Sequence, residues 1–121
     1  MQLMITVTQM SVLLKVQDMD QALAFYREKL GFQVDFRYQD FYAGISKDGY
    51  SIHLKLGAMQ EEYTEKTNDD LHVLFKVANI EGVNELLIKK GVRFIQPLRQ
   101  MDYGKEFYIA DPWDNRIGFI E

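Results

Sequence analysis

The sequence contains no cysteine, which excludes disulfide bonds, thiolate metal sites and a cysteine nucleophile. No apolar run approaches the roughly 20 residues that cross a bilayer, and the first ten residues lack the basic region and cleavage site of a signal peptide. The net charge is −4, without the clustered lysines and arginines of a phosphate-backbone binder. We therefore expect a cytoplasmic protein that binds neither nucleic acid nor membrane.

Several catalytic motifs are also missing from the sequence: it has no GxSxG, no glycine-rich phosphate loop and no HExxH. Histidine is scarce. The two histidines are His53 in "YSIHLKL" and His72 in "LHVLFKV", each inside an apolar, β-prone run. Such residues are either ordinary strand residues, polar members of a ligand pocket or metal ligands. The acidic net charge favours a cationic ligand over an anionic one, but only slightly.

The composition is that of a globular protein, with 47% hydrophobic and 26% charged residues in 121 positions, and predicts one domain over residues 1–121. In its first half a strand precedes a helix, and three strands follow. Asp18 is the expected N-cap of this helix, and Gly31 the expected stop. The predicted elements are a helix at 18–30 and strands at 11–16, 32–38, 41–46 and 50–56.

The same order of elements restarts after a polar stretch, with a helix predicted at 79–91 and strands at 72–77, 92–96, 105–110 and 116–121. With an offset of 61 positions, the strand "SVLLKV" aligns with "HVLFKV", and the helix caps Asp18 and Asn79 align as well. We predict an α+β fold of two βαβββ modules that form a cupped mixed sheet around a cleft. Module one covers about 9–57, a linker about 58–69, and module two about 70–121.

The alternation of each first strand indicates which side chains line this cleft. In module one Ser11 and Leu13 point away from the helix, and in module two His72 and Leu74 do so. Ligands commonly bind in a cleft between two such units.

Two stretches resemble a known family. "VQDMDQALAFYREKLGF" (16–32) resembles the opening motif of the vicinal oxygen chelate superfamily, which includes glyoxalase I, extradiol dioxygenases, and fosfomycin- and bleomycin-resistance proteins. "ADPWDNRIGFIE" (110–121) resembles its last turn and strand. The resemblance implies the fold predicted above. It also implies a homodimer, in which the linker would exchange or bridge between subunits.

The resemblance also identifies four positions at which metal-dependent members carry ligands. Here they hold Ser11, His53, His72 and Gly118, so only the two histidines could coordinate a metal. Catalytic zinc normally has three protein ligands. We therefore expect a metal-independent small-molecule binding protein, similar to the bleomycin-resistance branch, with no catalytic residue. The alternative is a metal-dependent lyase, isomerase, transferase or dioxygenase with a rebuilt site, using Zn, Ni, Fe or Mn.

Two aromatic residues complete the expected ligand site. Tyr103 in "DYG" resembles an aromatic turn that lies near the cavity in relatives, and Trp113 in "DPWDN" replaces a smaller polar residue. Trp113 could cover a ligand or a dimer partner, or could pack on the surface. The predicted ligand-binding residues are Ser11, His53, His72, Tyr103 and Trp113. Antibiotic resistance is a possible role that no residue establishes.

Overall fold

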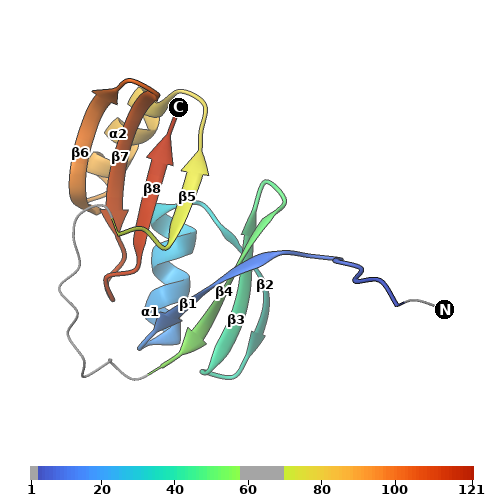
Figure 1. The fold of residues 1–121 in the computed structure, drawn as a ribbon. Coiled ribbons are helices and arrows are strands. Elements are labelled where there is room, and N and C mark those ends of the chain that lie inside the picture. The colour runs from blue at the N-terminus through green and yellow to red at the C-terminus, as the bar shows by residue number, and fades with distance from the viewer. Residues whose placement is uncertain (1–2, 58–69) are drawn as a thin grey trace.

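The computed structural model describes residues 3–57 and 70–121, which form two similar modules, one above the other in Figure 1. Each module contains a strand, a helical segment and three strands, so the predicted pair of βαβββ modules is confirmed. The predicted linker, 58–69, lies outside the described residues. Module one comprises β1 (Ser11–Val16), α1 (Met19–Ala24), η1 (Phe25–Lys29), β2 (Gln33–Tyr38), β3 (Tyr42–Lys47) and β4 (Tyr50–Leu56). Module two comprises β5 (Val73–Lys76), α2 (Ile80–Lys89), β6 (Arg93–Met101), β7 (Gly104–Ala110) and β8 (Arg116–Ile120).

The strands form two four-stranded sheets with the same topology. Sheet one has the order β1-β4-β3-β2, and sheet two has the order β5-β8-β7-β6. In each sheet the first strand pairs parallel with the last, and the other pairs are antiparallel. The repeat seen in the sequence is therefore a repeat of strand order as well.

Both helical segments begin at the caps that the sequence predicts. The side chains of Asp18 and Asn79 accept backbone N–H groups of the first turn at 2.9 Å and 3.3 Å. The first helix ends in the π-helical turn η1, which the regular spacing did not predict. Gly31, at φ +77°, then donates to the carbonyl of Arg27, and the next N–H reaches back to Tyr26, which satisfies the terminal carbonyls. Within the described ranges, no helix is long and apolar enough to cross a membrane.

Strand β6 is longer than predicted. The sequence indicates a strand at 92–96, whereas β6 continues through Pro97 to Met101 with irregular pairing to β7. A proline is tolerated here because β6 is an edge strand, so the missing N–H has no neighbouring strand to bind.

The first strand of each module alternates between core and surface as predicted. Leu14 and Val16 are buried, whereas Leu13 on the opposite face is 52% exposed. In the second module Phe75 packs against the core, and Leu74 is 54% exposed. Each sheet therefore buries one face under its helical side and leaves side chains of the other face accessible.

The turn before β8 joins the two modules. The hydroxyl of Tyr26, from η1, donates to Asp111 Oδ2 at 2.8 Å, and both side chains are fully buried. Asn115 Nδ2 donates to the carbonyl of Lys15 in β1 at 2.8 Å. Burial, together with the charge of Asp111 and its hydrogen bond, raises the pKa of Tyr26 well above the ordinary value for tyrosine. These bonds fix the position of module two against module one.

Candidate functional site

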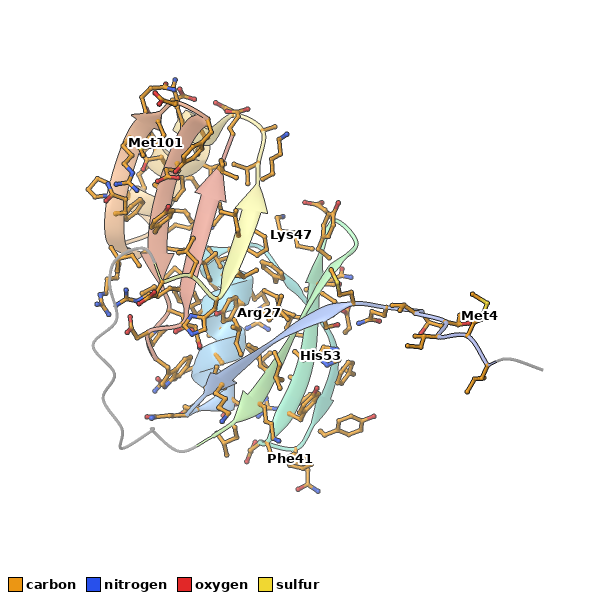
Figure 2. The ribbon with its side chains drawn as sticks, viewed as in Figure 1. Met4, Arg27, Phe41, Lys47, His53 and Met101 are labelled. Atoms are coloured by element: carbon orange, nitrogen blue, oxygen red, sulfur yellow. The ribbon has the colours of Figure 1, made fainter. Side chains whose placement is uncertain are left out.

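The face of sheet one opposite α1 brings two of the predicted residues close together. Because β1 and β4 pair in register, Ser11 lies opposite Ser51 and Leu13 lies opposite His53. Residues two apart on a strand share a face. Ser11 and His53 therefore lie on the same surface, which we call the His53 face; Figure 2 marks His53 on this sheet.

The imidazole of His53 is held by aromatic neighbours. Its Nδ1 is 2.7 Å from the Tyr42 hydroxyl, and the rings of Tyr42 and Phe36 meet it edge-on at centroid distances of 5.4 Å and 5.3 Å. Its Nε2 is buried and has no hydrogen-bond partner among residues 3–57 and 70–121. Buried polar atoms in proteins normally have a hydrogen-bond partner, so Nε2 is a candidate for contact with a bound molecule.

A glycine makes this arrangement possible. Gly44 pairs with His53 across β3 and β4, and a Cβ at position 44 would lie 2.2 Å from Cε1 of Phe36. The phenyl ring therefore rests directly on the β3 backbone and reaches the imidazole. Neither Gly44 nor Phe36 was predicted as a site residue from the sequence. The signal was a glycine at a surface-facing position of the strand "FYAGIS".

The hydroxyl of Ser11 is already engaged. It donates to Ser51 Oγ at 2.9 Å, and the side-chain amide of Gln9 donates to both hydroxyls at 2.8 Å and 3.0 Å. This polar group adds hydrogen-bonding capacity to the edge of the His53 face. A neutral, shared hydroxyl is a poor ligand for a divalent cation.

His72 lies just before β5 and belongs to a different local environment. It is exposed, its Nδ1 accepts the backbone N–H of Arg116 at 2.9 Å, and its own N–H donates to the Arg116 carbonyl at 2.8 Å. His72 therefore fastens the start of β8. Its neighbour Arg116 belongs to module two, whereas Tyr42 and Phe36, which surround His53, belong to module one.

Position 118 occupies the place in module two that His53 occupies in module one. His53 pairs with Leu13, and Gly118 pairs with Leu74, at the same point of the repeat. A Cβ at Gly118 would lie 2.7 Å and 2.9 Å from Cδ1 of Leu71 and Leu74, and 3.2 Å from the Tyr108 ring. Apolar side chains therefore fill the space that a ligand residue would need.

The described residues do not fit a metal site of the family type. They contain no group of three or more histidine, aspartate or glutamate side chains arranged to hold an ion. The serine at 11 is hydrogen-bonded, and position 118 has no side chain. The two histidines alone fall short of the three protein ligands of a catalytic zinc.

The hydroxyl of Tyr103 is hydrogen-bonded to a carboxylate, Glu106, that was not predicted from the sequence. Glu106, in β7, is only 3% exposed. Its Oε2 accepts from Arg99 Nε at 2.8 Å and from the Tyr108 hydroxyl at 2.9 Å, and Oε1 accepts from the Tyr103 hydroxyl. The register pairs Arg99 with Glu106, so the opposite charges across the "MDYG" turn were a usable signal.

The hydrogen bonds of this cluster set its ionisation. Burial acts to raise the pKa of Glu106, but the hydrogen bonds from Tyr103, Arg99 and Tyr108 outweigh it and lower that pKa. The bond to Glu106 raises the pKa of Tyr103 to about 12. Glu106 is therefore a charged, fully bonded carboxylate at neutral pH, and what Tyr103 offers to a ligand is its exposed ring.

Trp113 lies apart from these groups. It is half-buried and packs against the core, and its backbone N–H donates to Asp111 Oδ1 at 2.9 Å. The next residue, Asp114, has φ +63°, which aspartate adopts more readily than most residues. Core packing accounts for the tryptophan in this turn without a ligand.

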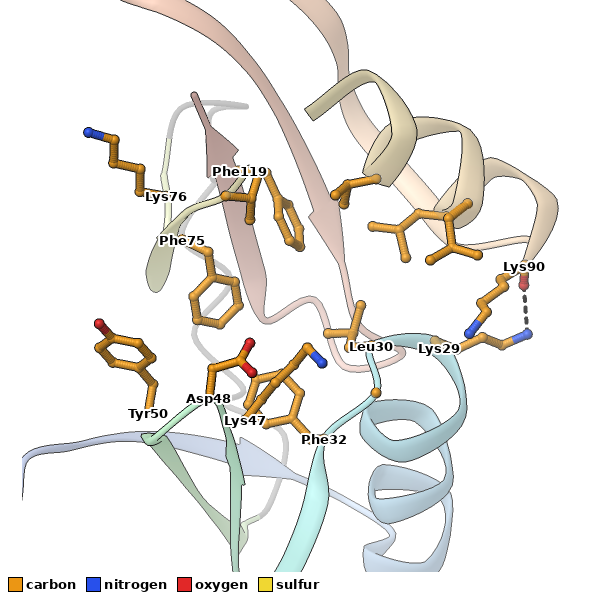
Figure 3. Close-up of a pocket in the computed structure, with 15 residues that line it drawn as sticks. Lys29, Leu30, Phe32, Lys47, Asp48, Tyr50, Phe75, Lys76, Lys90 and Phe119 are labelled. Carbon is orange, nitrogen blue, oxygen red and sulfur yellow. Dashed lines mark hydrogen bonds between the residues drawn. The ribbon is translucent and has the colours of Figure 1, made fainter. Parts of the chain in front are cut away.

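The structure also contains a pocket of about 330 Å³, partly open to solvent, at a different place. It lies on the helix-facing side of sheet two, between α2, the end of η1 and the β3–β4 turn (Figure 3). None of the five predicted ligand-binding residues lines it. The sequence offered no local signal for this pocket, because its walls come from distant segments.

Comparison with known proteins places this geometry in a family. The sequence model of the Glyoxalase/Bleomycin resistance protein/Dioxygenase superfamily matches residues 8–119. Comparison with curated proteins finds no match.

Solved structures share the fold over nearly the whole chain. UcmS2 is 26% identical with a TM-score of 0.76, and the alignment covers 96% of this chain and 98% of that one. TioX from Micromonospora sp. ML1 is 15% identical with a TM-score of 0.75, covering 93% and 97%. The genomically encoded fosfomycin resistance protein FosX from Listeria monocytogenes is 16% identical with a TM-score of 0.75, covering 96% and 93%.

Proposed function

Because the chain belongs to the glyoxalase/bleomycin resistance protein/dioxygenase superfamily, we propose that it binds a small organic molecule on the His53 face without a metal ion. The observation that carries this proposal is the filled position 118. There the backbone of Gly118 is covered by Leu71, Leu74 and Tyr108, where a fourth ligand would have to stand.

Capture would depend on aromatic contact and one directed hydrogen bond. Tyr38 is 61% exposed and packs on Phe36 with a centroid distance of 5.5 Å, so the two rings extend the apolar surface beside His53. An apolar or aromatic ligand that lies on these rings breaks few hydrogen bonds with water and removes the apolar surface from water, which favours binding. The Nε2 of His53, which is buried and has no partner among the described residues, would supply a hydrogen bond that orients the ligand once the side chains that cover it move aside.

Module two presents a second exposed ring and a polar group, on a sheet separate from the His53 face. Tyr103 is held in place through its hydroxyl by Glu106, which leaves its ring available for stacking. His72 presents its imidazole at the start of β5. Our proposal assigns ring contact on the His53 face to Tyr38 rather than to Trp113, because Trp113 packs on the core. No step of this function makes or breaks a bond.

Amide NMR titration in buffer containing EDTA tests the proposal. The panel comprises bleomycin, fosfomycin and small aromatic acids and amines. We expect at least one compound to shift the amide signals of Gly44, Ser51 and His53. His53→Ala should then weaken binding by about tenfold, the value of one buried hydrogen bond. Tyr50→Ala is the matched control, because Tyr50 lies on the opposite face of β4 and should leave the affinity unchanged.

Two results would overturn the proposal. The first is silence of these amides across the whole panel. The second is stoichiometric Zn, Ni, Fe or Mn that survives purification and is lost in both His53→Ala and His72→Ala. That result would favour the metal-dependent lyase, isomerase, transferase or dioxygenase. Such an enzyme would need metal ligands other than the two histidines, and residues 3–57 and 70–121 contain no group of three ligating side chains.

The quaternary state and the biological role belong to the same proposal. We expect a homodimer, which sedimentation velocity at micromolar concentration would detect as a single species of twice the 14.2 kDa chain mass. Sequestration of a drug is one use of such a binder. It requires that the ligand found in the titration be the drug and that expression raise the resistance of a host cell.

A further inference from the structure

The pocket on the helix-facing side of sheet two is an apolar chamber with both modules in its walls. Its volume of about 330 Å³ is at the small end of the range for ligand pockets. Leu30 and Phe32 come from module one, and Phe75, Val83 and Phe119 come from module two. Figure 3 shows the rings of Phe32, Phe75 and Phe119 facing the same space.

The aromatic wall of this pocket is continuous. The centroids of Phe32 and Phe75 are 6.1 Å apart, and those of Phe75 and Phe119 are 5.6 Å apart. The pocket is partly open to solvent, so its apolar wall is accessible to a bound molecule. An apolar ligand that filled the chamber would therefore gain contacts that the two modules do not make with each other.

The charges around the pocket are strongly unbalanced. Four lysines and one aspartate line it, in a chain whose net charge is −4. Within the described part of the chain, none of these lysines is paired with a carboxylate. The lysines are Lys29, Lys47, Lys76 and Lys90, and the aspartate is Asp48.

Two of these ammonium groups are held in fixed positions. Lys29 Nζ donates to the Lys90 carbonyl at 2.6 Å, and Lys90 Nζ donates to the Glu28 carbonyl at 2.7 Å (Figure 3 marks the first of these bonds). The bonds tie the ends of η1 and α2 together and complement their terminal carbonyls. Each ammonium has three donors, so each keeps two for a further acceptor.

Lys47 is the third cation at the same end of the pocket. In Figure 3 its side chain extends toward Leu30, and its Nζ lies 3.3 Å from the position of a Cβ on Gly31. Lys76, in contrast, points away from the chamber in this view. The cationic end of the pocket therefore consists of Lys29, Lys47 and Lys90, next to an apolar interior.

We propose that this pocket is a second small-molecule site, which takes a compound with an apolar body and one carboxylate. The volume equals that of about eleven waters at roughly 30 Å³ each, which suits a ligand of about that number of non-hydrogen atoms. The body lies against Phe75 and Phe119, and the carboxylate accepts hydrogen bonds from Lys47 and Lys90. This site is separate from the His53 face and does not depend on the function proposed for it.

Octanoate is the probe, and amide NMR is the readout. Octanoate should shift the signals of Gly31, Val77 and Leu86, which line the pocket, and leave those of Gly44 and Ser51 on the His53 face unchanged. Octylammonium and 1-octanol have the same chain without the anionic head. We expect each to bind at least tenfold more weakly, because a charge-assisted hydrogen bond is lost.

Three variants test the residues of the pocket. Lys47→Gln should weaken octanoate binding about tenfold. Lys55→Gln removes the same charge from β4 outside the pocket and should change the affinity less than twofold. Val83→Phe should fill the chamber and abolish binding, while the dispersion of its spectrum shows that the variant is folded.

Three outcomes would overturn this proposal. The first is equal binding of octanoate and octylammonium. The second is a set of shifted amides that lies on the His53 face instead of the pocket. The third is the absence of any octanoate effect at millimolar concentration. This includes the case in which a second copy of the chain covers the pocket, which a shift of the pocket amides with protein concentration alone would reveal. Failure of the ligand panel at the His53 face would leave this result unaffected.

Discussion

We expect Tyr26→Phe to destabilise the protein by about 1.5–3 kcal/mol, the usual value of a hydrogen bond to a charged group. Tyr26 is 0% exposed and Asp111 is 2% exposed, so water cannot replace the lost hydroxyl. The variant leaves Asp111 Oδ2 with the side-chain amide of Asn115 as its remaining donor. The residues are 85 positions apart and belong to different modules, so the loss weakens the junction between the modules.

The cost of removing Asp111 should be larger. Its two oxygens accept four hydrogen bonds, from the Tyr26 hydroxyl, the Trp113 N–H, and the N–H and Nδ2 of Asn115. We expect Asp111→Ala to cost about 3–5 kcal/mol, because several buried donors lose their acceptor together. A domain of this kind is usually stable by about 5–15 kcal/mol, so this variant approaches the limit of folding.

A double-mutant cycle in urea separates the pairwise bond from these losses. In the Asp111→Ala background, Tyr26→Phe should cost less than about 0.5 kcal/mol, which gives a coupling of about 1–3 kcal/mol. Tyr50→Phe, at an exposed tyrosine, is the control and should stay within about 0.5 kcal/mol of the parent. A coupling below about 0.5 kcal/mol would refute the view that this bond holds the modules together.

Glu106→Gln should lower the free energy of unfolding in urea at pH 7 by about 2–3 kcal/mol, because it removes the buried negative charge that accepts hydrogen bonds from Arg99 and Tyr108. Because the pKa of Glu106 is lowered in the fold, its contribution to stability is present above the ordinary pKa of 4.5 and is lost as the pH falls through the folded pKa. An equal loss of unfolding free energy in parent and variant between pH 7 and 3 would contradict this. The pKa values of Tyr26 and Tyr103 are raised in the fold, so the effect on stability has the opposite pH dependence. The contribution of these tyrosines to stability is intact below pH 10 and is lost as the pH rises through their folded pKa values. A spectrophotometric titration should show that both ionise above the ordinary pKa of tyrosine, and Tyr103→Phe should remove one component near pH 12. Gly118→Glu should not create a zinc site, which calorimetry with Zn²⁺ would show as the absence of binding heat, because its side chain meets leucine methyl groups. Gly44→Ala should displace the ring that covers it and weaken any ligand of the His53 face; an unchanged His53 ring environment in the NMR spectrum would contradict this.

Much of the fold could be predicted from local sequence signals. Alternation in "SVLLKV" and "HVLFKV", the caps Asp18 and Asn79, and the stop at Gly31 each act over a few residues, and the structure uses all of them. The extension of β6 through Pro97 was missed because it depends on β6 being an edge strand, which is a property of the whole sheet.

The candidate site could be predicted only in part. The register of β1 and β4 brings Ser11 and His53 to one face, as alternation suggests. The roles of Gly44 and Glu106 were missed, because each depends on a partner across a strand pair. The pocket on the helix-facing side of sheet two could not be predicted, because it depends on how the two modules pack. Its walls combine Phe32 with Phe119, which meet only after the modules have packed.

The two glycines on the sheet faces break the internal symmetry of the duplicated fold. Gly44 and His53 form a cross-strand pair in module one, and Tyr108 and Gly118 form the corresponding pair in module two. The large and the small residue of the pair have therefore changed strands between the modules, so module one has an imidazole on β4 where module two has a glycine covered by the Tyr108 ring. The two modules of the duplicated fold are therefore not equivalent. Any ligand that contacts both modules meets two different surfaces and has a single preferred orientation. Exchanging the pair in module two, with Tyr108→Gly and Gly118→His together, is then the shortest route to a symmetric protein with two copies of the same half-site.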